Sequence, residues 1–247
     1  MRYLVLTDIH ANLEALDTCL DDARRRGFDR TLVLGDLIGY GADPNAVVTS
    51  VQQLEPVAIV RGNHDKIAMG LEEAEGFNAV ARDAATWTYH TLTPEHRDWL
   101  AALPQGPAVV DDLVEICHGS PYDEDAYIFD ELDALRGLKS SARPLCLFGH
   151  THYPVTFELA GSALQGTGPS PEGKAVMPIA EGVKYLLNPG SVGQPRDGDS
   201  RAAYAIADTT TRQVELMRLV YPLKVAQQKI VNAGLPEVLA RRLASGR

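Results

Sequence analysis

Apolar segments alternate with amphipathic segments at the start of the chain, and this alternation constrains the fold more than any other feature. Apolar strand candidates occupy residues 2–6, 31–35 and 56–60. Two amphipathic helix candidates lie between them. One covers 12–27, with Asn12 as N-cap and Gly27 beyond its end, and the other covers 43–54, with Pro44 in its first turn. This order predicts a parallel α/β sheet with functional loops at the carboxyl ends of its strands.

The rest of the chain predicts further elements of a single domain spanning residues 1–247. We expect a helical insertion at about 65–103 and two C-terminal helices at about 222–245 that cover the sheet. Strand candidates fill most of the region between them. Residues 161–174 are rich in Gly, Ser and Pro and are expected to form a mobile loop. This loop resembles a phosphate-binding loop, but Ala175 replaces the required Ser or Thr, and its prolines lack N–H donors.

Composition excludes several classes of protein. The formal net charge is −10, so binding to nucleic acid or to an anionic membrane is not expected. No apolar stretch approaches the roughly 18 residues that span a bilayer. The three cysteines lie in apolar segments without paired spacing. Reduced thiols and a cytoplasmic location are therefore predicted.

Metal-ligating side chains follow five of the strand candidates. Five of the 7 histidines lie at these strand ends, together with two aspartates and an asparagine. The residues are Asp8, His10, Asp36, Asn63, His64, His118, His150 and His152. A parallel sheet brings the carboxyl ends of its strands together, and alternate residues of an extended chain point to one side. Mixed nitrogen and oxygen donors without thiolate suit Mn²⁺, Fe, Zn²⁺ or Ni²⁺.

The number of ligands indicates two ions. Seven ligands exceed what one ion with an open position needs. They suit two ions about 3.5–4 Å apart that share a carboxylate, an arrangement used in phosphoryl chemistry.

The ordered motifs DIH, GD, GNHD, H and GHTH resemble the calcineurin-like metallophosphoesterase superfamily over about residues 1–155. The later segment NPGSVGQPRDG resembles one in small bacterial members of that group. The resemblance implies a four-layer α/β/β/α sandwich with two packed mixed sheets. It also implies two divalent transition-metal ions, with Mn²⁺ favoured, and a metal-bridging hydroxide that attacks the phosphoester.

Residue roles follow from the same resemblance. One ion would be held by Asp8, His10 and His152. The other would be held by Asn63, His118 and His150, with Asp36 bridging both. His64 would act at the leaving group, with Asp65 holding its ring.

The substrate is expected to be a small phosphodiester, such as a nucleotide. Related protein Ser/Thr phosphatases and dinucleoside polyphosphate hydrolases carry GDxxDRG, with an arginine for phosphate and GNHE in place of GNHD. Here Tyr40 stands at the position of that arginine. Arg196 could supply the missing cation if its loop folds over the metals. The alternative is therefore a phosphomonoesterase that resembles the Ser/Thr phosphatases or the dinucleoside polyphosphate hydrolases. A non-catalytic scaffold of the same fold is disfavoured by the intact ligand set, and the oligomeric state stays open.

Overall fold

The computed structural model describes residues 1–74 and 76–247. Its strands form two six-stranded sheets, and both are mixed. The first has the order β3-β2-β1-β11-β12-β9, and the second has the order β4-β5-β6-β10-β7-β8. The strand bounds are β1 Arg2–Leu6, β2 Arg30–Val33, β3 Ala58–Ile59, β4 Ala108–Val109, β5 Val114–Ile116, β6 Leu145–Leu147, β7 Val155–Ala160, β8 Ala163–Thr167, β9 Lys174–Pro178, β10 Val183–Asn188, β11 Ala202–Asp208 and β12 Gln213–Leu219.

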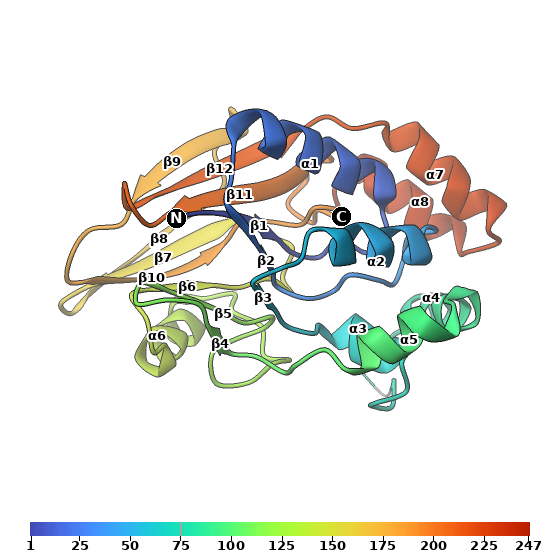
Figure 1. Cartoon of the computed structure of the whole chain (residues 1–247), viewed down its shortest axis with the longest axis horizontal. Helices are drawn as coiled ribbons and strands as arrows, with labels where there is room; N and C mark the ends of the chain where they lie inside the picture. Colours follow the sequence, from blue (N-terminus) through green and yellow to red (C-terminus); the bar gives the residue numbers. More distant parts are fainter. Residues whose placement is uncertain (75) are drawn as a thin grey trace.

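The helices flank the sheets on both outer faces. Their bounds are α1 Leu13–Arg26, α2 Pro44–Gln53, α3 Asn63–Ala68, α4 Ala79–Thr91, α5 Pro94–Ala101, α6 Glu131–Ser140, α7 Leu223–Asn232 and α8 Glu237–Ser245. Figure 1 shows α1, α7 and α8 along the first sheet, with α6 on the opposite side beside the second sheet. Among the described residues, no helix has both the length and the apolar character needed to cross a bilayer.

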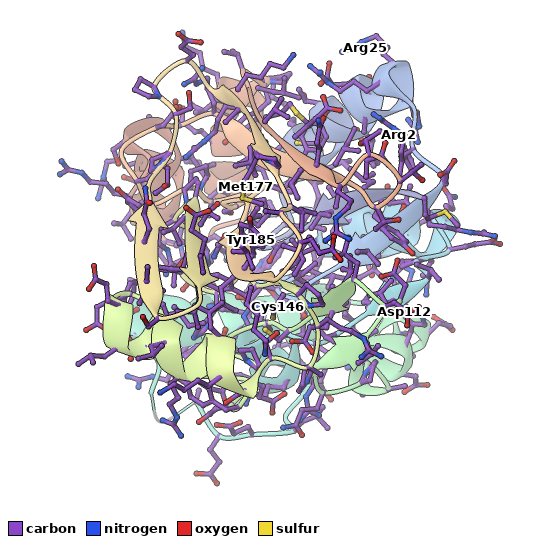
Figure 2. All side chains as sticks on the ribbon, turned by 90° about the vertical axis from the view of Figure 1, so that its left-hand side faces the viewer. Arg2, Arg25, Asp112, Cys146, Met177 and Tyr185 are labelled. Atoms are coloured by element: carbon purple, nitrogen blue, oxygen red, sulfur yellow. The ribbon has the colours of Figure 1, made fainter. Side chains whose placement is uncertain are left out.

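Three apolar clusters account for the predicted α/β/β/α layers. The cluster between the sheets combines side chains such as Val5 and Leu32 of the first sheet with Ile116 and Leu147 of the second. A second cluster joins the outer face of the first sheet to α1, α2, α7 and α8. A third joins the second sheet to α6. In Figure 2, Met177 and Tyr185 lie between the sheets, whereas Cys146 lies on the side of α6. The predicted sandwich is confirmed.

Parallel pairing of β1, β2 and β3 is also confirmed. The first helix begins and ends as predicted, because the Asn12 side chain accepts a hydrogen bond from Ala15 N–H and Gly27 follows the last turn. The predicted helical segment after β3 contains α3, α4 and α5, which Figure 1 shows grouped below α2. Of the C-terminal helices, α7 packs against α1 and α8 packs against α7, and both contribute to the outer cluster of the first sheet.

One local expectation is wrong. Residues 161–174 do not form one loop, because β8 pairs with β7 in an antiparallel hairpin. The Gly- and Ser-rich composition concealed this strand. The helical segment after β3 begins inside the GNHD motif, slightly earlier than expected. Asn63, His64 and Asp65 form the first turn of α3, and the Asp65 carboxylate accepts a hydrogen bond from Gly62 N–H at the helix start.

Candidate metal centre

The carboxyl ends of strands from both sheets meet at one edge of the sandwich. β1 leads to Asp8 and His10, and β2 leads to Asp36. The candidate ligand atoms form two clusters. Within each cluster, these atoms all lie within 4.8 Å of one another. The first cluster contains Asp8, His10, Asp36 and His152, and the second contains Asp36, His118 and His150. All these residues are buried.

In the first cluster, two imidazoles face each other. The Nε2 atoms of His10 and His152 are 3.1 Å apart. Asp36 Oδ2 lies 3.4 Å from His10 Nε2, and Asp8 Oδ1 lies 3.5 Å from His152 Nε2. Two nitrogens and two carboxylates therefore converge on one point.

The second cluster repeats this arrangement on the other side of Asp36. His118 Nε2 lies 3.1 Å from His150 Nδ1 and 3.3 Å from Asn63 Oδ1. The same Asp36 Oδ2 atom lies 3.5 Å from His118 Nε2. One carboxylate oxygen is thus shared by both clusters, as a bridging ligand requires. The structure brings together all seven residues predicted as ligands.

Backbone carbonyls fix the tautomers of the four histidines. The ring nitrogen away from the cluster lies 3.1 Å from the Ile38 carbonyl in His10 and 2.8 Å from that of Leu34 in His118. The outer nitrogen of His150 lies 3.0 Å from the Asp125 carbonyl, and that of His152 lies 2.6 Å from the Gln194 carbonyl. A carbonyl only accepts, so these outer nitrogens carry a proton, and in the neutral form of each ring the inner nitrogen presents a lone pair to the cluster.

Two nitrogen lone pairs 3.1 Å apart repel each other unless a proton or a metal ion lies between them, so the donor set fits a metal. Burial opposes the charged form of His118, but the Asp36 carboxylate outweighs burial and raises the pKa of His118 to about 10. Burial raises the pKa of Asp8 to about 7. The cluster without metal therefore retains protons that a divalent ion would replace.

The backbone at the candidate ligands is strained. Asp8, Asp36 and His150 have φ values of 51°, 52° and 68°, and His10 and His152 have similar values. Residues other than glycine avoid this left-handed region, at a cost of about 1–3 kcal/mol each. Close packing adds a further constraint, since a Cβ on Gly62 would lie 2.1 Å from Asp36 Oδ1. The fold thus tolerates strain in order to aim these side chains inward.

The structure places His64 beside the clusters, but the expected role of Asp65 as its support is wrong. Asp65 Oδ1 accepts hydrogen bonds from the backbone N–H groups of Leu37 and Ile38, and Oδ2 accepts one from Gly62. The Asp65 carboxylate therefore ties the loop after β2 to the start of α3. Within the described part of the chain, His64 Nδ1 is buried without a hydrogen-bond partner. Its ring packs against Tyr40, at 4.3 Å between centroids, and against Phe77, at 4.5 Å.

A cavity of about 160 Å³ opens next to the clusters. Tyr40 and Arg196, both predicted to bind substrate, line it together with His64. Sequence reasoning missed two other lining residues, Tyr127 and Arg242. Tyr127 stacks on His150 with 3.9 Å between ring centroids. Arg242 lies on α8, and its helical segment carries no motif that could have indicated it.

The comparisons with known proteins agree with this geometry. The sequence model of the calcineurin-like phosphoesterase superfamily domain matches residues 1–212. An uncharacterized protein of Methanocaldococcus jannaschii, MJ0912, is 36% identical over 98% of this chain and 97% of its own length.

Two crystal structures are similar over the whole chain. A metallophosphoesterase from Sphaerobacter thermophilus is 38% identical, with a TM-score of 0.87 over 100% of this chain and 99% of that one. A hypothetical protein from Pyrococcus horikoshii, PH1004, shares the fold at 19% identity, with a TM-score of 0.79 over 100% and 98% of the two chains. The chain therefore belongs to the calcineurin-like phosphoesterase superfamily.

Proposed function

We propose that this protein hydrolyses phosphoesters at a centre of two divalent metal ions. One observation carries the proposal: two pairs of imidazole nitrogens, each 3.1 Å apart, flank a single Asp36 oxygen. Asp8, His10 and His152 would hold one ion, and Asn63, His118 and His150 the other. When bound, such ions draw charge from phosphoryl oxygens and lower the pKa of water, with Mn²⁺ the first candidate.

The protein's own residues position and complete this chemistry. Carbonyl hydrogen bonds keep the outer ring nitrogens of the four imidazoles protonated, so a metal ion has to displace only protons held on the inner nitrogens. His64 borders the cavity beside the clusters, where it can donate a proton to the departing oxygen of the substrate. Tyr40 and Phe77 hold the His64 ring from its sides, in place of the carboxylate that we expected.

A phosphodiester is the first candidate substrate because Tyr40 occupies the position where monoesterase relatives carry arginine. A phosphomonoester is the second, because Arg196 lines the same cavity and can meet additional negative charge. The comparison that separates them is kcat/KM for bis-nitrophenyl phosphate against nitrophenyl phosphate at equal Mn²⁺ loading. A tenfold preference for the diester would correspond to about 1.4 kcal/mol of differential transition-state binding. The opposite preference, abolished by Arg196→Ala, would establish the monoester.

The activity itself is tested with a panel of phosphomonoesters and phosphodiesters, adding Mn²⁺, Ni²⁺, Mg²⁺ and Zn²⁺ separately. Metal-dependent turnover that disappears in Asp36→Asn supports the proposal. Stoichiometric metal binding without turnover of any ester would indicate a non-catalytic scaffold instead.

A further inference from the structure

Two arginines from distant parts of the chain reach the cavity beside the metal clusters. Arg196 lies in the loop between β10 and β11, and Arg242 lies on α8. Their guanidinium carbons lie 5.9 Å and 6.0 Å from the centre of the Tyr40 ring. The superfamily match ends at residue 212, so Arg242 belongs to a segment that the shared domain does not include.

Backbone contacts fix the position of both arginines. The Arg196 N–H donates to the carbonyl of the candidate ligand His152, at 3.4 Å, and the Gly198 N–H donates to the Gly246 carbonyl, at 2.9 Å. The first contact places Arg196 next to the metal centre. The second joins its loop to the end of α8, so the two segments that bring Arg196 and Arg242 to the cavity are tied together.

Neither arginine is neutralised by an Asp or Glu carboxylate within residues 1–74 and 76–247. Arg196 donates to the Gln194 side chain, while its Nε is buried without a partner in that part of the chain. Arg242 Nε donates to the Arg247 backbone carbonyl. By contrast, the neighbouring Arg241 is exposed and lies 3.3 Å from Glu237. Partly buried cations without counter-charges are costly unless an anion joins them.

The net charge of the centre indicates how much negative charge a bound anion should carry. This step rests on the proposed function, because it counts two divalent ions. Two divalent ions bring four positive charges, and Asp8 and Asp36 remove two. Arg196 and Arg242 restore the total to four. A phosphodiester carries one negative charge and leaves most of this unmatched.

We propose that Arg196 and Arg242 bind a second phosphate group of the substrate, next to the phosphoester that is cleaved. The substrate class is then a phosphoester with at least two phosphate groups, and Arg242 is a specificity-determining residue.

Binding of imidodiphosphate, whose two phosphates are joined by nitrogen, tests the proposal without turnover. Calorimetry on the Mn²⁺-loaded full chain would compare its Kd with that of orthophosphate. We expect Arg242→Gln to weaken imidodiphosphate about 10–100-fold, as for loss of charge-assisted hydrogen bonds, and orthophosphate less than threefold. Arg242→Lys should recover part of the loss. Arg241→Gln is the matched control on the same helix and should change neither Kd.

Equal weakening of both ligands, or no weakening of either, would overturn the role of Arg242. An unchanged melting temperature of Arg242→Gln is required, and Arg196→Lys provides a second variant with the same expected selectivity. Failure of the proposed function would give a different result from failure of the role of Arg242. In that case the wild-type protein turns over no phosphoester, whatever the two Kd values show.

Discussion

Replacing His64 by alanine should slow the cleavage of esters with poor leaving groups and leave the bound metal unchanged. The ring borders the cavity, and its Nδ1 faces Gly39, where an added Cβ would lie 2.7 Å away. With Nδ1 buried, Nε2 is the nitrogen that remains for the leaving group. The His64 ring packs edge-on against His10, with 4.9 Å between centroids, but among the described residues neither group of candidate ligand atoms includes a His64 nitrogen, so metal content should not depend on it.

The size of the effect follows from the charge state of His64. Burial lowers the pKa of His64 to about 4, so the ring is neutral in the free protein at pH 7. A unit negative charge about 4 Å from the ring favours the imidazolium by about 4 kcal/mol at an effective dielectric constant of about 20. The negative charge of the substrate therefore opposes the effect of burial and raises the pKa of His64 above its value in the free protein. General acid catalysis then contributes about 10²–10⁴ in kcat.

The assay compares phenyl and nitrophenyl esters of the same phosphate for wild type and His64→Ala. The loss should reach about 10²–10⁴ for phenol and shrink for nitrophenolate, which needs no proton. Because the protonated ring is the active form, kcat should fall as pH rises through the pKa of the complex, and His64→Ala should remove this limb. His90→Ala, an exposed histidine on α4, is the control. Equal losses for both esters, or loss of metal, would refute the reasoning.

Three further predictions concern the residues that support the site and the contribution of bound metal to stability. Gly62→Ala should reduce metal binding strongly because its Cβ would lie 2.1 Å from Asp36 Oδ1, whereas Gly168→Ala, with no atom within 4 Å of its Cβ, should bind metal normally in the same titration. Asp65→Ala should lower the free energy of unfolding by about 3 kcal/mol or more, because three buried N–H groups lose their acceptor; urea denaturation measures this, and an unchanged midpoint would contradict it. Removing metal with a chelator should lower the Tm by about 5–10 °C, as expected for loss of a ligand present at about 100 times its Kd, and added Mn²⁺ should restore it. A Tm indifferent to chelation would mean that no metal was bound.

The sequence predicted those parts of the fold that depend on the local pattern of apolar and polar residues. Strand-helix alternation gives the parallel pairing of β1, β2 and β3, and the polar residues after each strand mark the edge where the site forms. The strand β8 escaped prediction because Gly166 and its polar neighbours are exposed, so no apolar period marks it. Its pairing with β7, rather than its own composition, makes it a strand.

Contacts made at long range explain what was missed in the site. Asp65 serves backbone N–H groups 27 and 28 residues away, and local sequence does not reveal such a partner. Arg242 reaches the cavity because Leu239 and Leu243 anchor α8 in the apolar cluster on the outer face of the first sheet. In the sequence it looks the same as Arg241, which points to solvent. Residue type and spacing thus identify the candidate ligands at strand ends. Charged residues that tertiary packing brings to the site can be identified only from the folded structure.

The sharing of Asp36 between two ions is tested most directly by counting the metal. Elemental analysis of protein reconstituted with Mn²⁺ should give two ions per chain. Asp36→Asn should lose both, because its Oδ2 lies 3.4 Å from His10 Nε2 and 3.5 Å from His118 Nε2. His152→Ala should lose mainly one, since His152 belongs to only the first cluster. Saturation at one ion per chain with full activity, or retention of one tightly bound ion by Asp36→Asn, would contradict the account.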